Sequence, residues 1–377
     1  MAWIDKQRNV IDFTLSSLFR RKGKNAALIA VYTAVVFVLA SVMLFTHALK
    51  REAMIVLRDA PEIVLQRMVA GRHDLMPASY AAVVGKITGV NSVKSRLWGY
   101  YYDQLFRANY TLLVPDEFKY GEGEIIIGEG VSRTGVTAEG NIMPFFGSNG
   151  KLVSYRVREI LPSESELVSS DMVMMGEKDF RAFFNLPKDY VTDLVVNVAN
   201  PLEVLTVAAK IRQQLPDTRP IVREEIVRTY DAIFDWRSGI MLVIFSGALL
   251  AFVIFAWDKA SGLSAAEKRE IGILKATGWE TSDVILMKFW EGMAISFTSF
   301  TTGLILAYVH VFFSSAALFE PVLKGWAVLY PNFRVVPFIN FYQVATLFFL
   351  TVVPYTTATV IPSWRAATVD PDAVMRT

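Results

Sequence analysis

Residues 267–280 read Glu-Lys-Arg-Glu-Ile-Gly-Ile-Leu-Lys-Ala-Thr-Gly-Trp-Glu, a charged and helix-prone stretch between two hydrophobic segments. Within a membrane the backbone must be hydrogen-bonded internally, which favours helices for the flanking segments and places the polar stretch at a membrane surface. A short helix in that position is suited to take up force from a soluble partner and to pass it into a membrane bundle.

Hydrophobic residues make up 53% of the 377 residues, and the mean hydropathy is +0.36, above that of an ordinary soluble protein. They gather in four runs, at residues 26–47, 240–257, 284–313 and 341–361. Each run has roughly the 20 apolar residues that a helix needs to cross about 30 Å of hydrocarbon. We predict four transmembrane helices. Buried core helices are the alternative, but these are shorter or carry a polar stripe.

The segment before the first run is basic and amphipathic. Apolar residues such as Trp3, Ile11 and Phe19 alternate with charged residues such as Asp5 and Lys6. This pattern predicts a helix that lies along the inner membrane surface and braces the first span; a disordered basic tail is the alternative. A signal peptide also begins basic, but the first run is too long for a typical signal sequence, so we expect a retained anchor.

Orientation follows from the short flanks, because Lys and Arg there resist translocation. Basic residues are frequent before the first run and between the second and third runs, whereas the connection from the third to the fourth run has only Lys324 and Arg334. We therefore predict that both termini and the 267–280 stretch are cytoplasmic. The predicted parts are a cytoplasmic amphipathic helix (1–24), a first transmembrane helix (25–48), an extracytoplasmic α+β domain (49–236), a domain of three transmembrane helices with a short helix at about 266–279 (237–363), and a cytoplasmic tail (364–377).

The predicted outer domain alternates strand and helix signals. A strand, a helix and a strand are predicted at residues 62–66, 77–87 and 92–102, with a further strand at 110–114. A second strand, helix and strand are predicted at residues 193–198, 201–215 and 219–224. Two such β-α-β halves can pair into one small sheet. An insert at about 122–181 separates them, with strand patterns at 124–128 and 152–160 and a helix pattern at 177–184.

Several kinds of chemistry are excluded by composition. Cys is absent and the three His residues are far apart in sequence, so no metal site, disulfide or Cys nucleophile is expected. His47 and His310 lie at span ends, where we expect interfacial rings. The net charge of +2 gives no indication of nucleic-acid binding. The run 147–151 lacks the spacing of a Walker A motif. We therefore expect no catalytic residue and no cofactor in this chain.

The 267–280 stretch has two helical stripes. Ile271, Leu274 and Gly278 fall at i, i+3 and i+7, and a more polar stripe lies beside them. One face is expected to enter a groove of a partner, while a solvated loop helix is the alternative. Gly278 suits the residue just past a helix end.

The region resembles the FtsX-like or MacB-like permeases, also called the type VII ABC transporter group. That family has a run of the form Glu-x-x-x-Glu-Ile-Gly-x-Leu-x-Ala-x-Gly before its third span. Here the run is matched by Glu267, Glu270, Ile271, Gly272, Leu274, Lys275, Ala276 and Gly278, with the first Glu one residue nearer. The third span adds Glu291, Gly292 and Gly303, and residues 362–376 are similar to the family's closing Pro-x-x-Arg-Ala-x-x-x-Asp-Pro pattern.

The resemblance implies a permease that forms a homodimer or a heterodimer with a paralogue and binds two copies of a separate ABC ATPase subunit. It implies mechanotransmission, in which ATPase closure tilts the second span and its stalk, residues 254–264, and moves the outer domains. The β-α-β halves would form a porter-like subdomain and the insert a second lobe. The implied ATPase-coupling residues are Glu267, Lys268, Arg269, Glu270, Ile271, Gly272, Leu274, Lys275 and Gly278.

Other residues are candidates for roles in the spans. Glu291 lies about two turns into the third span, where an acid is costly unless it is paired, interfacial or wet, and Lys288 is one turn away. It either holds the bundle or lies at the interface. Gly303 is a second candidate. Pro354 removes a hydrogen bond from the fourth span and makes either a hinge or a static kink.

An aromatic cluster lies in the predicted outer domain. Because alternate residues of a strand point to opposite faces, about half of it belongs to the core. Trp98, Tyr100 and Tyr102 are the candidate face for an acyl chain or a partner protein.

These observations predict the permease subunit of an ABC complex in a bacterial inner membrane. The resemblance implies an amphiphilic cargo: a lipoprotein, a lipid, a peptide or a small toxic molecule passed to a periplasmic adaptor. A second hypothesis is a signal transmitter that activates a periplasmic partner such as a cell-wall hydrolase. A third is a membrane sensor without an ATPase. Membrane lipids are contacts in all three.

Overall fold

The computed structural model describes residues 2–58, 60–162, 166–229, 265–319 and 335–367, together with the isolated positions 232, 246, 247, 250, 254 and 329. The chain divides into two compact units. One unit is helical and comprises Met1–Leu49, Phe234–Ala316 and Val336–Thr377. The other comprises Lys50–Ile233 and Ala317–Val335 and has an α+β fold.

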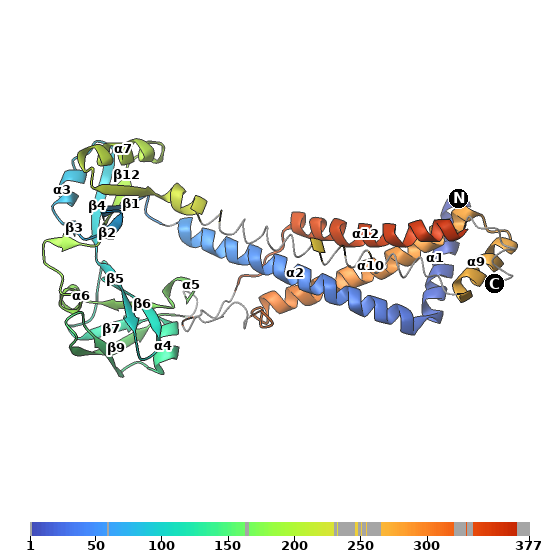
Figure 1. Cartoon of the computed structure of the whole chain (residues 1–377), viewed down its shortest axis with the longest axis horizontal. Helices are drawn as coiled ribbons and strands as arrows, with labels where there is room; N and C mark the ends of the chain where they lie inside the picture. Colours follow the sequence, from blue (N-terminus) through green and yellow to red (C-terminus); the bar gives the residue numbers. More distant parts are fainter. Residues whose placement is uncertain are drawn as a thin grey trace. The chain divides into compact units, whose positions relative to one another are not determined.

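The described part of the helical unit contains α1 (Ala2–Arg20), α9 (Ala265–Ala276), α10 (Thr281–Phe312), α12 (Phe341–Ala367) and most of α2 (Lys22–Arg58) (Figure 1). Within the described residues three helices are long and apolar enough to cross a membrane: Lys22–Glu52, Thr281–Phe312 and Phe341–Ile361. They coincide with the first, third and fourth predicted spans. The predicted second span, residues 240–257, lies almost wholly outside the described residues, as does most of the predicted stalk.

The first long helix is longer than predicted. α2 has 37 residues, which is about 55 Å at 1.5 Å per residue. The sequence pattern ends its apolar run at His47, but helix formation does not depend on apolarity, and Lys50, Arg51 and Glu52 continue the helix as good helix formers. One uninterrupted helix therefore joins the apolar segment to the α+β unit.

The first sheet of the α+β unit has the strand order β13-β1-β12-β4, with β2 paired to β1. Its strands are β1 (Ile63–Val69), β2 (Arg72–Asp74), β4 (Val90–Arg96), β12 (Asp193–Val198) and β13 (Thr218–Val222), and its helices are α3 (Tyr80–Val84), the 3-10 turn η2 (Pro201–Glu203) and α7 (Val204–Gln214). β1 pairs antiparallel with both β12 and β13. The prediction that two β-α-β halves pair into one sheet is confirmed.

The predicted helix at residues 77–87 is wrong in its extent. α3 covers only Tyr80–Val84, and Pro77 belongs to the short strand β3 (Met76–Pro77), which pairs with β11 (Tyr190–Val191). After Val84 the amides of Lys86 and Ile87 bond to carbonyls three residues earlier. This tighter winding ends the helix and directs the Ile87 side chain into the core.

The second sheet has the order β5-β6-β10-β7-β9-β8. Its strands are β5 (Trp98–Asp103), β6 (Ala108–Leu113), β7 (Glu124–Ile127), β8 (Ile142–Phe146), β9 (Leu152–Ile160) and β10 (Met172–Met175), accompanied by α4 (Glu129–Gly135), α5 (Glu166–Ser169) and α6 (Glu177–Phe184). The inserted lobe therefore begins at Trp98, not at about residue 122. The predicted single strand 92–102 is two strands, β4 and β5, in different sheets.

The chain passes between the two sheets at Leu97, and a polar junction holds this point. Asp193 is fully buried and accepts two hydrogen bonds from the Arg96 guanidinium, at 2.7 and 2.6 Å, and one from Trp98 Nε1, at 2.9 Å. The Thr192 hydroxyl also exchanges hydrogen bonds with the backbone N–H and C=O of Trp98. Both sheets are thereby tied at one place.

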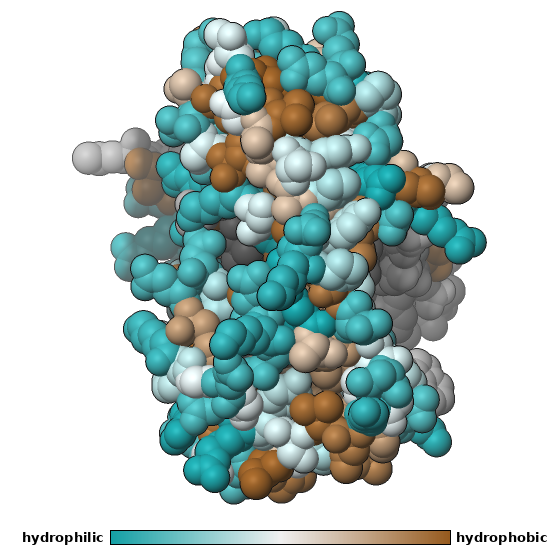
Figure 2. Space-filling model, turned by 90° about the vertical axis from the view of Figure 1, so that its left-hand side faces the viewer, coloured by the Kyte–Doolittle hydropathy of each residue, from teal (hydrophilic) through white to brown (hydrophobic). Residues whose placement is uncertain are grey.

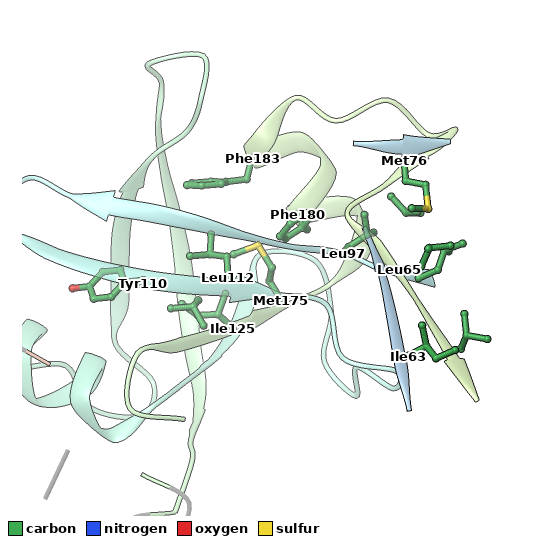
Figure 3. Close-up of a cluster of buried hydrophobic side chains, with 14 of the residues drawn as sticks. Ile63, Leu65, Met76, Leu97, Tyr110, Leu112, Ile125, Met175, Phe180 and Phe183 are labelled. Atoms are coloured by element: carbon green, nitrogen blue, oxygen red, sulfur yellow. The ribbon is translucent and has the colours of Figure 1, made fainter. Parts of the chain in front are cut away.

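A single hydrophobic cluster extends across both sheets. In Figure 3 Leu97 lies between Ile63 and Leu65 of the first sheet and Phe180, which packs on the second. The face of this unit seen in Figure 2 is largely hydrophilic, with hydrophobic side chains in small separate groups.

Ser170 in this unit donates a hydrogen bond of 3.0 Å to the carbonyl of Leu329, so the connection between α10 and α12 contacts the lobe.

Removing the junction carboxylate should destabilise the α+β unit. Asp193→Ala leaves the Arg96 guanidinium and the Trp98 indole without their shared acceptor, which we expect to cost about 2–4 kcal/mol. Hydrogen exchange of the β12 amides in the full chain should accelerate accordingly. Lys94→Ala is the control, because the Lys94–Asp116 pair is largely exposed, at 58% and 73%, and should cost less than about 1 kcal/mol. Equal effects of the two substitutions would contradict the assignment.

Candidate functional site: the α9 region

The short cytoplasmic helix predicted at about 266–279 is α9, and hydrogen bonds define its end. The amide of Gly278 donates to the Lys275 carbonyl at 3.1 Å, and the amide of Trp279 donates to the Leu274 carbonyl at 3.0 Å. This pair of bonds is the Schellman arrangement. Gly278 has φ +98°, a conformation that glycine adopts without strain. The prediction that Gly278 lies just past the helix end is confirmed.

Four residues separate the end of α9 at Ala276 from the start of α10 at Thr281. Glu280 is the N-cap of α10 and forms a capping box with Asp283, whose carboxylate accepts from the Glu280 amide at 3.2 Å. A capping box satisfies amides that a helix start otherwise leaves without partners. α9 therefore ends, and α10 begins, with hydrogen-bonded backbone groups, which fixes the geometry of the turn between them.

The apolar stripe of α9 is buried within the chain. Ile271 is 5% exposed and Leu274 is 8% exposed, and both pack in a cluster with Val10, Val284 and Met287. The partly buried members of this cluster are Phe13, Trp279, Leu286 and Trp290. The interpretation that this stripe is free to enter a partner groove is therefore wrong for Ile271 and Leu274, because α1 and the start of α10 already cover them. Gly272 is also buried.

Other α9 residues face outward. Arg269, Ile273, Ala276, Thr277 and Gly278 are exposed, and Lys275 is half-buried. Ile273 is 51% exposed. The backbones of Glu267 and Lys268 belong to α9, while their side chains lie outside the described residues. The outward face of α9 thus combines a cation with an exposed apolar side chain.

Polar contacts join α1 to the same region. Glu270 forms ion pairs with Arg20 and Arg21, and Lys6 lies 2.6 Å from the Asp283 carboxylate. The hydrogen bond and charge of Asp283 raise the pKa of Lys6. A raised lysine pKa means that this pair is stabilising at neutral pH and is lost only as the pH rises into the alkaline range.

The contact between α1 and α9 is not evident from the sequence. Val10 and Phe13 are three residues apart, a spacing that predicts a shared helical face. That spacing identifies an apolar face but not its partner, so membrane lipid was inferred where a protein helix lies. α1 also has a second, exposed apolar set, Ile4, Leu15 and Phe19.

α10 packs closely on α2 and α12. A Cβ at Gly303 would lie 2.8 Å from Val36 Cβ and 3.0 Å from the Thr33 carbonyl, and a Cβ at Gly292 would lie 2.5 Å from Thr359 Oγ1. Small residues allow this close approach of membrane helices. His310, expected at the interface, is only 8% exposed and lies 3.2 Å from Ser41 Oγ. It is part of the α2–α10 contact.

The remaining predicted span residues have simple environments. Lys288 Nζ donates to Glu291 Oε2 at 2.6 Å, so Glu291 is paired with a residue one turn away, and its role in the bundle stays a prediction. This pair satisfies a carboxylate that would be costly alone at that depth. Pro354 lies inside α12, which continues helically on both sides of it.

The aromatic residues of β5 alternate as predicted. Tyr100 is 71% and Tyr102 is 53% exposed, whereas Tyr101 packs against the core. The Trp98 ring stacks on His73 at 5.8 Å and meets Tyr100 edge-on at 5.4 Å. Tyr100 and Tyr102 are exposed beside the half-buried Trp98, and the three residues form the aromatic face of β5.

Two of three comparisons with known proteins found similarities. The family model "FtsX-like permease C-terminal" matches residues 238–371. Among solved structures, the extracellular domain of the noncanonic ABC-type transporter YknZ from Gram-positive bacteria matches with 13% identity and a TM-score of 0.29, covering 42% of this chain and 98% of that one. The periplasmic region of MacB from Actinobacillus actinomycetemcomitans matches with 10% identity and a TM-score of 0.30, covering 45% and 92%. No curated protein sequence matches.

The close α2–α10 contact predicts a sharp effect of a small substitution. Gly303→Ala should destabilise the helical unit by about 1–3 kcal/mol, because the added methyl overlaps Val36 and the α2 backbone. Thermal unfolding of the purified chain in detergent measures the effect. Gly23→Ala is the matched control: Gly23 lies in a helix with nothing within 4 Å of a Cβ, so alanine should be neutral or stabilising by up to about 1 kcal/mol. A harmless Gly303→Ala would mean that the helices do not approach this closely.

Proposed function

Because residues 238–371 carry an FtsX-like permease C-terminal domain, we propose that this chain is the membrane subunit of an ABC transporter that works by mechanotransmission. A separate ABC ATPase subunit docks on the outward face of α9. ATP hydrolysis on that partner displaces α9, and the membrane helices carry the displacement to the α+β unit. The chain itself supplies no ATPase chemistry, and ATP and Mg belong to the partner.

The observation that carries this proposal is the construction of α9. Its inner stripe is fixed by packing and its outer side offers Arg269 and Ile273. An exposed apolar side chain beside a cation fits a protein groove that is apolar at its centre and acidic at its rim. Because the backbone groups of the turn to α10 are hydrogen-bonded, α9 is rigidly connected to α10 and passes its displacement to the membrane helices.

The membrane helices carry the displacement of α9 to the α+β unit. α10 is held to α2 and α12 through glycine and hydroxyl contacts, including Ser299 Oγ to the Ile29 carbonyl at 3.3 Å and Ser296 to Thr356 at 3.4 Å. α2 then continues as one helix to Arg58. A shift of α10 therefore acts on α2, whose far end is covalently part of the α+β unit.

The proposed extracytoplasmic role rests on the aromatic residues of β5. The aromatic face of Trp98, Tyr100 and Tyr102 suits an acyl chain or an apolar segment of a protein, since aromatic rings offer large apolar area with few rotatable bonds. This favours an amphiphilic cargo: a lipoprotein, a lipid, a peptide or a small toxic molecule, passed to an adaptor. Activation of a periplasmic protein such as a cell-wall hydrolase is the second candidate, because the same face can bind a partner.

The assembly that we propose has two permease copies, identical or paralogous, and two ATPase copies in a bacterial inner membrane. Both termini are cytoplasmic, together with α9. The exposed apolar set Ile4, Leu15 and Phe19 of α1 lies against the inner leaflet, as expected for an amphipathic helix with basic residues beside its apolar face.

Docking on the outward face of α9 predicts that Ile273→Asp weakens ATPase association. A carboxylate placed in an apolar groove should weaken binding at least about tenfold, measured by co-purification and by ATP hydrolysis of the complex. The thermal stability of the permease should be unchanged, because Ile273 is 51% exposed. Leu274→Asp is the comparison, since Leu274 is buried and this change should lower stability. Normal ATPase binding by Ile273→Asp would remove α9 from the interface.

The aromatic face separates the two candidate functions. The double substitution Tyr100→Ala with Tyr102→Ala should leave folding intact, because both rings are largely exposed. If the chain transports an amphiphile, release or accumulation of that compound should fall, while ATPase association persists. If it is a signal transmitter, only the activity of the periplasmic partner should fall. Replacement of exposed Phe146 by Ala, on the other edge of the same sheet, serves as the control.

A further inference from the structure

We propose that α1 is part of the coupling site and moves together with α9 when the ATPase displaces α9. The displacement then reaches α2 directly through α1, as well as through α10. This inference rests on the proposed docking of an ATPase on α9. It assigns Glu270 to α1 as a positioning residue, and not to direct contact with the ATPase.

The first support is the apolar contact. Val10 is 4% exposed and packs with Ile271 and Leu274 of α9. The Phe13 ring lies 5.2 Å from the Trp279 ring, centroid to centroid. Closely packed side chains of this kind move as a body, because separating them exposes apolar surface to water.

The second support is the polar contacts on both sides of this apolar patch. At one end Glu270 binds Arg20 and Arg21, and at the other Lys6 binds Asp283. Trp290 Nε1 also donates to Gln7 Oε1 at 3.2 Å. α1 is therefore attached near its beginning, middle and end, which fixes its direction relative to α9 and the start of α10.

The third support is the bond between α1 and α2. α1 ends at Arg20 and α2 begins at Lys22. Asn25 of α2 is 7% exposed and donates from Nδ2 to the Leu18 carbonyl of α1 at 3.0 Å, while its amide donates to the Arg21 carbonyl at 3.1 Å. These bonds fix the corner between the helices, so a rotation of α1 turns the start of α2.

The charges give a decisive test. Glu270→Arg alone, and Arg20→Glu with Arg21→Glu, each place like charges together and should detach the end of α1 from α9. The triple variant restores opposite charges with reversed sign. If Glu270 positions α1, the first two variants should keep the ATPase bound but lower permease-stimulated ATP hydrolysis at least about fivefold, and the triple variant should recover it. Arg8→Glu, an exposed reversal elsewhere on α1, is the control.

A triple variant that stays as impaired as Glu270→Arg would overturn the proposal and assign Glu270 to the ATPase. Normal coupling in all variants would overturn it as well. Failure of the wild-type chain to bind an ATPase would instead reject the proposed function.

A second measurement avoids charge reversal. The chain has no cysteine, so Phe13→Cys with Trp279→Cys can be joined specifically by a bifunctional maleimide. Helices that move together should tolerate the link, and hydrolysis should match that of the unlinked pair. Loss of coupling on linking would mean that α1 and α9 must separate, which contradicts the proposal.

Discussion

Ile271 and Leu274 are buried against Val10 of the N-terminal helix, and this contact constrains the end of the helical unit that contains α1, α9 and the start of α10. It decides which side of α9 remains available and keeps α1 close to the start of α10. Apolar burial supplies most of its strength, since partly exposed ion pairs such as Glu270 with Arg20 contribute little each. The ion pairs instead set the register between the helices, because only one alignment brings both ends of α1 to their partners.

The membrane helices are also held together by a few specific contacts. Where α10 crosses α2, glycine and hydroxyl groups replace large side chains, and the helices meet at the backbone. Lipid tails are as apolar as leucine, so burial of leucine gives membrane helices no advantage over lipid. Close van der Waals contact and hydrogen bonds hold them. A bundle held in this way shifts between discrete packings more readily than it bends.

The sequence predicted features that depend on neighbours in the chain. Apolar runs identified three of the described helices, strand alternation separated Tyr100 and Tyr102 from Tyr101, and Gly278 marked the end of α9. The sequence did not predict which segment packs against a given face of a helix or strand. The amphipathic N-terminal segment was expected to lie on the membrane surface, but its Val10 and Phe13 pack on protein, because amphipathicity does not reveal what lies opposite an apolar face. The division of residues 92–102 between two sheets depends on Thr192 and Asp193, almost a hundred residues away, and local pattern carries no trace of them.

The hydrogen bond from Ser170 to Leu329 has a mechanical consequence. The α10–α12 connection belongs to the same unit as the sheets, so that unit is tethered by the end of α2 and also by this connection. Because Leu329 also packs against the hydrophobic cluster of the two sheets, the returning chain is anchored in the α+β unit by an apolar contact as well as by this hydrogen bond.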